Sequence, residues 1–450
     1  MVFQTDDASS IRVRLALRRL APAVGSISAR VPERFCHGFE RCLVKGADES
    51  DRSNTMKHRI LVLGAGYAGA FSAGYLARQL RSDEVEITVV NAEADFVERL
   101  RNHQLAAGQE LPHRPLSKVF AGTGIRIRLA RVTGVDPDRR IVHVEGDQGS
   151  DRLQYDTLLY ALGSTVADHG VPGVNEHAFH VAGRPAALRL RRRLDELGGH
   201  GKVVVVGGNL TAIETATELA ESRPGFQITL ATSGELGGWL GSKARRHLLR
   251  AFDRFGIAIR EHTTVDRVEA AGVVSGGTDI ASDATVWTAG FAVHPIAAAS
   301  GLAVAATGQI AVDRQMRSLS HPDVFVAGDC AYAIAENGRP LPMSCASAGP
   351  TSKRAIAAII EDLTGRKAPI VKLSYIGNHI SLGRDDAIFQ LVDGDARSRT
   401  GALLGRKAAR VKGAVLKGAA WGAAHPTFGM PTRKYRLAAE VDRATNTLAA

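Results

Sequence analysis

The segment from His58 to Ala70, HRILVLGAGYAGA, constrains the fold more than any other part of the chain. Its continuous apolar run, Ile60 to Leu63, is typical of a buried parallel strand. A glycine turn follows, and then an alanine-rich helical pattern from Ala68 to Leu80. In such a turn the first glycine allows a tight bend, the second admits a pyrophosphate, and the third lets the helix approach the strand. We therefore expect a dinucleotide to bind at Gly64, Ala65, Gly66 and Gly69.

A second apolar strand, Val85 to Val90, completes a strand–helix–strand unit. Units of this kind usually carry an acid at the end of that strand, where it holds the ribose hydroxyls. This chain has Asn91 there, with Glu93 two residues later. Since an amide can donate and accept hydrogen bonds without carrying a charge, we interpret Asn91 as the candidate ribose contact.

The composition limits the class of protein. The chain has 450 residues, 45% hydrophobic and 23% charged, which suits a soluble globular protein of two or three domains. No apolar run approaches the roughly 18 to 20 residues that span a bilayer, and no secretory signal pattern is present. Four cysteines without a CxxC motif favour a reducing, cytoplasmic setting over a disulfide scaffold or a zinc site. We expect no metal.

The net charge of +11 is a local property of the C-terminal part of the chain. Between Ala396 and Ala439 there are ten Lys or Arg residues and no Asp or Glu, so this segment holds nearly all of the excess charge. The rest of the chain is close to neutral, which argues against a nucleic-acid-binding face.

The first 55 residues show no periodic core pattern, and Met56 opens directly onto the first strand. We interpret residues 1–55 as a poorly ordered leader or as the product of an upstream start. An arginine-rich targeting segment is the alternative. Cys36 and Cys42 lie in this leader and receive no chemical role.

The region after the second strand is less regular. Residues 95–118 are polar and are expected to form an irregular excursion, in which His103 is a structural, hydrogen-bonding residue. Three strand-like stretches follow, and the last ends on the small residues Ala161-Leu162-Gly163-Ser164, where backbone can pass close to a flat ligand. The three stretches are Ile125–Val132, Ile141–Val144 and Tyr155–Leu162.

Lys202 to Ala220 repeats the opening theme, because an apolar strand leads through two glycines, Gly207 and Gly208, into a helical pattern. Asn209 stands where the second fingerprint glycine would be, and Ala212 stands at the third position, where alanine is tolerated. Two such units predict two dinucleotide sites.

The matching second strand of this unit is Gln227–Ala231, which ends at Thr232 rather than at an acid. Discrimination between dinucleotides with and without a 2′-phosphate therefore stays open, with Lys243, Arg245 and Arg246 nearby in the sequence. We interpret these three cations as a solvated face of the helix expected over Ser242–Phe255.

Two further strands end on small residues. Ala284–Gly290 reads ATVWTAG, and Asp323–Asp329 reads DVFVAGD. Ligands bind just outside the carboxyl ends of strands in open α/β sheets. Asp329 is therefore expected to accept a hydrogen bond from a ligand hydroxyl; a turn or helix-cap Asp is the alternative.

The motifs GAGYAG, ALGS, GGNLTAIE, TAG and VFVAGD occur in one order and spacing. This set resembles the two-dinucleotide-binding flavoproteins, the FAD-dependent pyridine nucleotide oxidoreductases, over roughly residues 57–363. The resemblance implies an α/β fold with two Rossmann-like domains and a C-terminal region. The implied boundaries are 56–180 and 289–345 for the FAD-binding domain, 181–288 for an inserted NAD(P)-binding domain, and 346–450 for the C-terminal region.

The resemblance also implies site residues. FAD would be bound by Gly64, Ala65, Gly66, Gly69, Asn91, Val132, Ala161, Gly163, Gly328, Asp329, Cys345 and Ala346. NADH or NADPH would be bound by Gly207, Gly208, Glu214, Thr232, Ala289 and Gly290. Because hydride passes between the cofactors, no catalytic residue is expected. A helix beginning near Ser344 would aim its positive end at the flavin, while Cys330 and Cys345 are interpreted as buried, inert thiols.

Within the family, the layout most resembles single-subunit, non-proton-pumping NADH:quinone dehydrogenases and their actinobacterial-type relatives. DFVERLRNHQLAAG, GDCA and LPMSCASAG support that comparison. The redox-disulfide branch is excluded, because Phe71-Ser72-Ala73-Gly74 stands where its cysteine pair would be. Ser344–Pro350 replaces the glutamine-containing motif beside which quinone docks.

The expected activity is transfer of electrons from NAD(P)H through FAD to a quinone. Reduction of a ferredoxin-like protein and a non-catalytic flavin or dinucleotide sensor are the alternatives.

The basic tail predicts an amphipathic helix over Leu404–Ala419. A helical projection gathers Leu404, Ala408, Val411, Val415 and Ala419 on one face and Arg406, Arg410 and Lys417 on the other. Such a helix can lie on an anionic membrane surface, here the inner face of the cell membrane; each nearby cation contributes about 1 kcal/mol. Packing on the body or on a partner subunit, including a homodimer, is the alternative. Under the membrane hypothesis, a chain ending near residue 395 would keep FAD and NAD(P)H oxidation.

Overall fold

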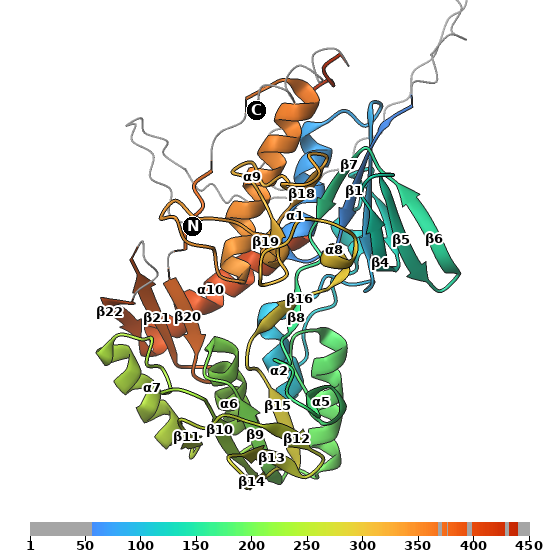
Figure 1. Cartoon of the computed structure of the whole chain (residues 1–450). Helices are drawn as coiled ribbons and strands as arrows, with labels where there is room; N and C mark the ends of the chain where they lie inside the picture. Colours follow the sequence, from blue (N-terminus) through green and yellow to red (C-terminus); the bar gives the residue numbers. More distant parts are fainter. Residues whose placement is uncertain (1–55, 368–370, 376, 394–397, 428–431, 440–450) are drawn as a thin grey trace, which may run out of the picture. The chain divides into compact units, whose positions relative to one another are not determined.

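A computed structural model describes residues 56–367, 371–375, 377–393, 398–427 and 432–439, and Figure 1 shows their course. The predicted leader, residues 1–55, lies outside the described residues. The described chain is an α/β protein with two parallel sheets, as the sequence predicts. Among the described residues, no helix is long and apolar enough to cross a membrane.

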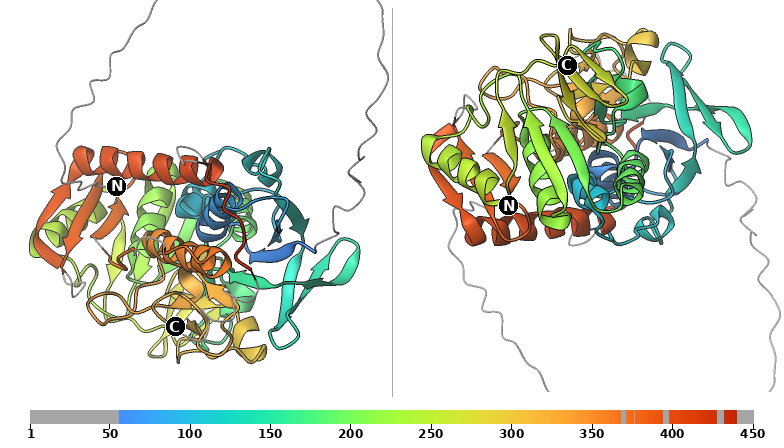
Figure 2. Two further views of the ribbon diagram at one scale, coloured as in Figure 1. Left: turned by 90° about the horizontal axis from the view of Figure 1, so that it is seen from above. Right: turned by 90° about the horizontal axis from the view of Figure 1, so that it is seen from below.

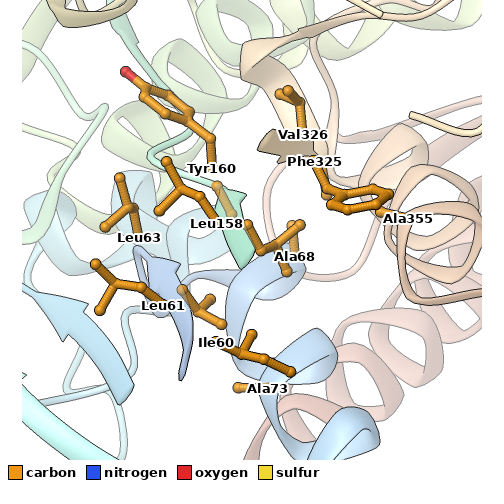
Figure 3. Close-up of a cluster of buried hydrophobic side chains, with 14 of the residues drawn as sticks. Ile60, Leu61, Leu63, Ala68, Ala73, Leu158, Tyr160, Phe325, Val326 and Ala355 are labelled. Carbon is orange, nitrogen blue, oxygen red and sulfur yellow. The ribbon is translucent and has the colours of Figure 1, made fainter. Parts of the chain in front are cut away.

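The first sheet has the strand order β18-β7-β1-β2-β3, and every pair in it is parallel. Its strands are β18 (Val324–Val326), β7 (Thr157–Tyr160), β1 (His58–Leu63), β2 (Val85–Asn91) and β3 (Arg126–Leu129). Helices α1 (Tyr67–Gln79) and α9 (Cys345–Thr364) pack against each other beside it. Figure 3 shows the resulting core, in which Leu63, Leu158 and Phe325 come from three strands and Ala355 comes from α9. This sheet brings the carboxyl ends of β1, β7 and β18 to one edge.

The predicted strand Ile125–Val132 is wrong, because these residues belong to two sheets. Strand β3 ends at Leu129, and β4 (Arg131–Asp136) opens an antiparallel sheet with β5 (Ile141–Gly146) and β6 (Gly149–Gln154). Strand β6 is exposed along most of its length, so it lacks the alternation by which a half-buried strand is recognised.

The second sheet has the order β11-β10-β9-β15 and is also parallel throughout. Its strands are β11 (Ala258–Arg260), β10 (Phe226–Ala231), β9 (Gly201–Val206) and β15 (Ala284–Trp287). Helices α5 (Arg184–Glu196), α6 (Leu210–Ser222) and α7 (Ser242–Arg254) supply apolar side chains to its core. A smaller antiparallel sheet consists of β12 (Arg267–Glu269), β13 (Gly272–Ser275) and β14 (Thr278–Ala281).

The chain passes between the two parallel sheets at β8 (Ser164–Val166) and returns at β16 (Phe291–Val293). These two strands pair with each other in antiparallel register, Phe291 opposite Val166 and Val293 opposite Ser164. The two crossings are therefore joined by backbone hydrogen bonds.

The excursion at residues 95–118 is more regular than predicted, because it contains η1 (Arg99–Arg101), α2 (Asn102–Ala107) and α3 (Leu116–Val119). Helix α2 packs on α5 and α6, and its Leu105 and Ala106 are buried in the second core. A six-residue helix without a side-chain cap gains most of its stability from such packing. That packing is not visible in the local sequence.

The C-terminal region forms an antiparallel sheet of β20 (Gly377–Ser381), β21 (Ala387–Val392) and β22 (Ser398–Leu404), followed by α10 (Gly405–Ala424). Helix α10 contacts β21 and β22 and reaches α1, as Figures 1 and 2 show. Tyr435 then forms backbone hydrogen bonds with Gln79 and Arg81. The described segment after α10 thus returns to the end of α1.

The predicted apolar face of α10 is divided between protein and solvent. Ala408 is buried as expected, but Val411 and Val415 are 39% and 45% exposed. The buried face is formed by Ala408, Lys412, Ala420 and Ala423. The face that packs on the protein therefore differs from the projected apolar face: small alanines let the helix approach the sheet, and the buried Lys412 pairs with Glu214.

Candidate functional site

The first glycine turn has the geometry that the sequence predicts. A Cβ atom on Gly69 would overlap the carbonyl oxygen of Gly64, and Gly64 itself has a φ of +92°. By contrast, apart from its neighbours along the chain, no described residue comes within 4 Å of the position that a Cβ on Gly66 would take. Gly66 is also the N-cap of α1, whose first turn carries no acid. This open position at a helix N-terminus suits the pyrophosphate of a dinucleotide.

Asn91 holds the first glycine turn. Its Oδ1 accepts the backbone N–H of Ala65 at 2.8 Å, and its Nδ2 donates to the backbone oxygen of Glu93 at 2.7 Å. Both ends of the carboxamide are therefore occupied by backbone groups. The role that the structure gives to Asn91 is to support the turn, and its contact with a ribose stays a prediction.

Asp329 belongs to a chain of hydrogen bonds at the carboxyl ends of β7 and β18. The Ser164 hydroxyl donates to Asp329 Oδ2 at 2.6 Å. Arg99 donates to both oxygens of Ser164, from Nη1 to the backbone oxygen at 2.6 Å and from Nη2 to Oγ at 2.9 Å. The Arg99 guanidinium also lies 5.2 Å from the centre of the Phe291 ring. Nothing in the local sequence marks Arg99 among the cations of the excursion.

The other residues predicted to bind FAD divide into two groups. Gly163 and Gly328 have φ values of +71° and +81° and flank the Ser164–Asp329 contact. The Gly328 N–H donates to Thr351 Oγ1 at 3.0 Å, which ties this edge to α9. Val132 and Ala161 are buried and support the sheet.

Helix α9 begins where the sequence predicts. Ser344 is its N-cap, and the Ser344 hydroxyl accepts the N–H of Ala346 at 3.1 Å. Cys330 is buried as expected, whereas Cys345 is half-buried. Burial raises the pKa of both thiols to about 12, and the Asp329 charge adds to this effect at each of them. Both thiols therefore remain protonated near neutral pH.

The second glycine turn replaces a glycine with a capping residue. Gly207 has a φ of +134°, and a Cβ there would lie 2.8 Å from the backbone oxygen of Thr288. Asn209 Oδ1 accepts the Ala212 N–H at 3.1 Å, and its Nδ2 donates to the same Thr288 oxygen at 2.8 Å. Asn209 thus caps α6 and ties it to the end of β15.

The remaining residues predicted to bind the nicotinamide nucleotide lie near this turn. Thr232 is buried against Gly208. The Ala167 N–H donates to the backbone oxygen of Gly290 at 3.1 Å, and the His169 Nε2 lies 3.2 Å from the backbone oxygen of Ala289. These contacts fasten the end of β15 to the crossing at β8.

Arg245, one of the three cations that follow Thr232 in the sequence, forms a hydrogen bond and ion pairs within the protein. Its Nε donates to the backbone oxygen of Leu236 at 3.0 Å, and its Nη2 lies 3.3 Å from Glu261 and 3.5 Å from Glu235. Lys243 and Arg246 are exposed on α7.

Glu214 contacts the C-terminal region. Its Oε1 accepts the Ser381 N–H at 3.0 Å and pairs with Lys412 of α10. Lys412 also donates to the backbone oxygen of His379 at 3.1 Å. Burial lowers the pKa of Lys412 to about 7, while the adjacent carboxylate favours its charged form. The sequence analysis missed Lys412, because it counted this residue only among the ten cations of the C-terminal segment.

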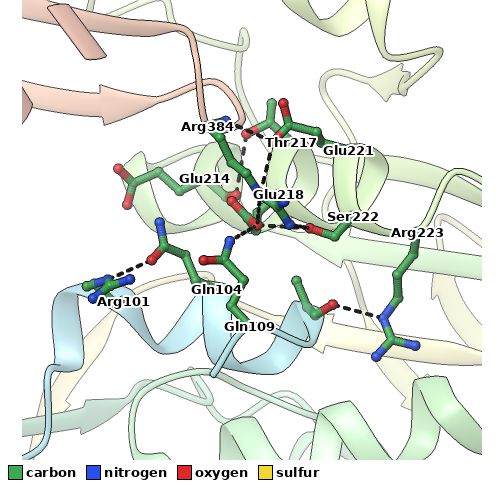
Figure 4. Close-up of polar contacts among 11 residues, drawn as sticks. Arg101, Gln104, Gln109, Glu214, Thr217, Glu218, Glu221, Ser222, Arg223 and Arg384 are labelled. Atoms are coloured by element: carbon green, nitrogen blue, oxygen red, sulfur yellow. Dashed lines mark hydrogen bonds and ion pairs between the residues drawn. The ribbon is translucent and has the colours of Figure 1, made fainter. Parts of the chain in front are cut away.

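Figure 4 shows a second carboxylate of α6, Glu218, which is fully buried. Its Oε1 accepts hydrogen bonds from Gln109 Nε2 at 2.5 Å and from the Ser222 hydroxyl at 2.9 Å, and Arg384 Nε lies 3.4 Å away. Since Gln109 follows α2 and Arg384 lies between β20 and β21, Glu218 joins three parts of the chain.

His103 of α2 is buried, but its Nε2 has no hydrogen-bond partner among the described residues, so the predicted hydrogen-bonding role is not confirmed. Burial, followed by the charges of Lys412 and Arg101, lowers the pKa of His103 to about 3. His103 is therefore neutral near neutral pH.

The sequence of residues 58–351 matches the family model described as pyridine nucleotide-disulphide oxidoreductase. The chain belongs to this family. Among its relatives, an NADH dehydrogenase-like protein of Mycobacterium tuberculosis is 30% identical over 358 residues, covering 74% of this chain and 87% of the relative. A type II NADH:quinone oxidoreductase of Staphylococcus epidermidis is 25% identical over 380 residues, covering 77% and 93%.

The fold agrees with the family assignment. The crystal structure of a sulfide:quinone oxidoreductase from Aquifex aeolicus superposes with a TM-score of 0.68 at 22% identity and covers 83% of this chain and 93% of that one. The family, the α/β fold and the enzyme class expected from the sequence are thus confirmed. The protein is an oxidoreductase that uses FAD and NAD(P)H, and the open position at Gly66 fits a dinucleotide.

Gly66 provides a test of this site that separates binding from folding. The Gly66→Leu side chain would enter the open position, so we expect loss of bound flavin with little change in the unfolding temperature of the flavin-free protein. In Gly69→Leu the side chain would overlap backbone, so the protein itself should be destabilised. Flavin absorbance per protein and thermal unfolding measure the two effects. Gly401→Leu, at an open position on β22, is the control, and full flavin content in Gly66→Leu would contradict the assignment.

Because His103 is buried and its pKa is lowered, we expect the free energy of unfolding to decrease in acid. Its pKa is about 3 in the folded chain against 6.5 as the ordinary value, so between these values the unfolded chain binds more protons and stability falls as the pH falls. His103→Leu removes this proton uptake. Its free energy of unfolding should therefore drop less than that of the parent between about pH 7 and about pH 5. Urea unfolding at both pH values measures the difference, with the exposed His200 as His200→Leu for control. Equal acid losses in His103→Leu and parent would contradict the prediction.

Proposed function

We propose that the protein oxidises NADH or NADPH and reduces a quinone at an anionic membrane surface. The observation that carries this proposal is the combination of two dinucleotide-type glycine turns with an unusual outer face on α10. The relative from Staphylococcus epidermidis, named as a type II NADH:quinone oxidoreductase, supports quinone as the acceptor.

The outer face of α10 combines apolar and cationic side chains. Val411, Val415 and Trp421 are 39%, 45% and 44% exposed. Arg406, Lys407, Arg410 and Lys417 are exposed on the same helix, which contains no acid. A helix with these properties binds an anionic membrane by burying its apolar side chains at the level of the headgroups. A quinone acceptor dissolves in the same layer, so this position would place the enzyme beside its substrate.

We assign FAD to the first glycine turn and the nicotinamide nucleotide to the second. Gly64, Gly66 and Gly69 would receive the FAD pyrophosphate, and Asp329 would hold the ribityl chain while Ser164 and Arg99 fix its carboxylate. Gly207, Gly208, Ala289 and Gly290 would line the nucleotide site. Helix α9 shares the first core, which supports extending the FAD-binding part to Thr364 and starting the C-terminal region after it.

Bound FAD would supply the hydride acceptor and pass the electrons on, so the protein needs no acid, base or nucleophile for that step. The chain holds and orients the reactants instead. The uncapped first turn of α1 offers backbone N–H groups to phosphate. The first turn of α9 carries no acid either. Its positive end would favour negative charge on a flavin ring bound beside it, by a fraction of a kcal/mol up to about 2.

The first test follows the electrons. Purified full-length protein should show flavin absorbance, lose it on anaerobic addition of NADH or NADPH, and recover it on addition of a menaquinone analogue. Bound flavin that neither nucleotide bleaches would favour the non-catalytic sensor. Recovery with a ferredoxin-like protein but not with quinone would replace the acceptor and leave NAD(P)H oxidation in place.

The second test addresses the membrane. Because α10 packs on the body and Lys412 pairs with Glu214, removal of residues 396–450 would disturb more than the surface, so point substitutions are sharper than truncation. Val411→Ser with Val415→Ser should weaken binding to anionic vesicles by roughly tenfold or more, with flavin content and flavin bleaching by NAD(P)H retained. Leu319→Ser, at an apolar residue that is 65% exposed elsewhere, is the matched control. If the parent ignores anionic vesicles at low salt, the membrane location is excluded.

A further inference from the structure

The segment between β10 and α7 lies over the second glycine turn. The indole Nε1 of Trp239 donates to the backbone oxygen of Gly208 at 3.3 Å. The Trp239 side chain remains 36% exposed. An aromatic ring that faces solvent is thus held beside the turn that leads into α6.

The C-terminal sheet holds this segment in place. The Ser398 hydroxyl donates to the backbone oxygen of Trp239 at 2.7 Å. The fully buried Gln390 accepts the Gly241 N–H on its Oε1 at 3.2 Å, and its Nε2 donates to the backbone oxygen of Arg399 at 2.6 Å. Residues of β21 and β22, more than 140 positions away in the sequence, therefore position the tryptophan.

Two carboxylates near this end of the second sheet, those of Glu235 and Glu261, form ion pairs within the protein. Thr232 stands at the position where an acid usually holds the adenosine ribose. Glu235 and Glu261 both pair with Arg245, at 3.5 and 3.3 Å, and Glu261 also accepts the Leu236 N–H at 2.7 Å. Since Thr232 carries no carboxylate and the two nearby glutamates are paired with Arg245, the adenosine half of the nucleotide needs a different contact.

We propose that Trp239 supplies this anchor: its ring packs against the adenosine half of NAD(P)H, and the C-terminal sheet positions it through Ser398 and Gln390. The proposal rests on the nucleotide site assigned to the second glycine turn and is independent of the electron acceptor. An aromatic face binds a planar base or a ribose through apolar contact. It is also indifferent to the 2′-phosphate, so it serves NADH and NADPH alike. The C-terminal region thereby contributes to the affinity for the nucleotide.

Three tryptophans allow the contact to be observed directly. Trp287 is 3% exposed and donates to the backbone oxygen of Ala167, and Trp421 lies on α10. Titration of the oxidised, FAD-containing protein with NAD⁺ or NADP⁺ leaves the flavin oxidised, so tryptophan fluorescence and calorimetry report binding alone. The parent should show quenching that disappears in Trp239→Phe and persists in Trp421→Phe.

Affinity provides the second readout. Trp239→Ala should bind NAD⁺ and NADP⁺ roughly tenfold more weakly with unchanged flavin content. In rapid anaerobic mixing with NADH it should need more nucleotide for half-maximal flavin reduction, at an unchanged limiting rate. Ser398→Ala should weaken binding in the same direction, whereas Thr400→Ala, at an exposed residue of the same strand, should not.

Two outcomes would overturn the proposal. If Trp239→Ala binds both nucleotides as tightly as the parent, the ring is not part of the site. If Trp239→Ala loses its flavin or unfolds, Trp239→Phe decides, because quenching that persists in it excludes contact. If the parent binds neither nucleotide, the nucleotide site itself is refuted. If the parent binds a nucleotide but the fluorescence of Trp239 does not change, only the tryptophan contact is refuted.

Discussion

Helix α1 approaches strand β1 at a distance that only glycine permits, and the first glycine turn depends on this contact. A Cβ on Gly69 would overlap the carbonyl oxygen of Gly64, so any larger residue would push the helix away from the strand. Because the strand and helix meet there, the N-terminus of α1 opens at Gly66 onto the carboxyl edge of the sheet. Asn91 then secures the turn by accepting the Ala65 N–H. The second glycine turn is secured by a different asparagine contact: Asn209 caps α6 and donates a hydrogen bond to the backbone at the end of β15.

Helix α6 links the second glycine turn to the C-terminal region through charged groups, of which Glu218 and Lys412 are buried. Buried carboxylates are costly unless they are paired, and the partners of Glu214 and Glu218 come from α10 and from the turn after β20. These pairs specify how the C-terminal sheet sits on the second parallel sheet. The hydrogen bond from Ser398 to the Trp239 backbone joins the same two parts at the other end. Helix α10 and the segment beside the second glycine turn thus contact the same C-terminal sheet.

Local patterns in the sequence were sufficient for the glycine turns, the strands that lead into them, and the start of α9 at Ser344. They failed where packing overrides pattern. The excursion at residues 95–118 is polar, yet Leu105 makes α2 part of the second core. The stretch Ile125–Val132 looks like one strand, yet the chain changes sheets after Leu129. In α10 the projection gathered the apolar residues correctly but did not show which face packs on the protein, where three alanines and Lys412 are buried.

The sequence by itself determined the two dinucleotide units, the family, and the carboxyl-end position of Asp329. Each of these follows from short-range rules: a buried parallel strand is a continuous apolar run, and a tight turn against a helix needs glycine. Only the tertiary structure decided that Arg99 supports Ser164 and Asp329, that Lys412 is buried against Glu214, and that Trp239 lies on Gly208. The partners in these contacts are 31 to 198 positions apart. Their meeting depends on how the sheets pack, which no local pattern encodes.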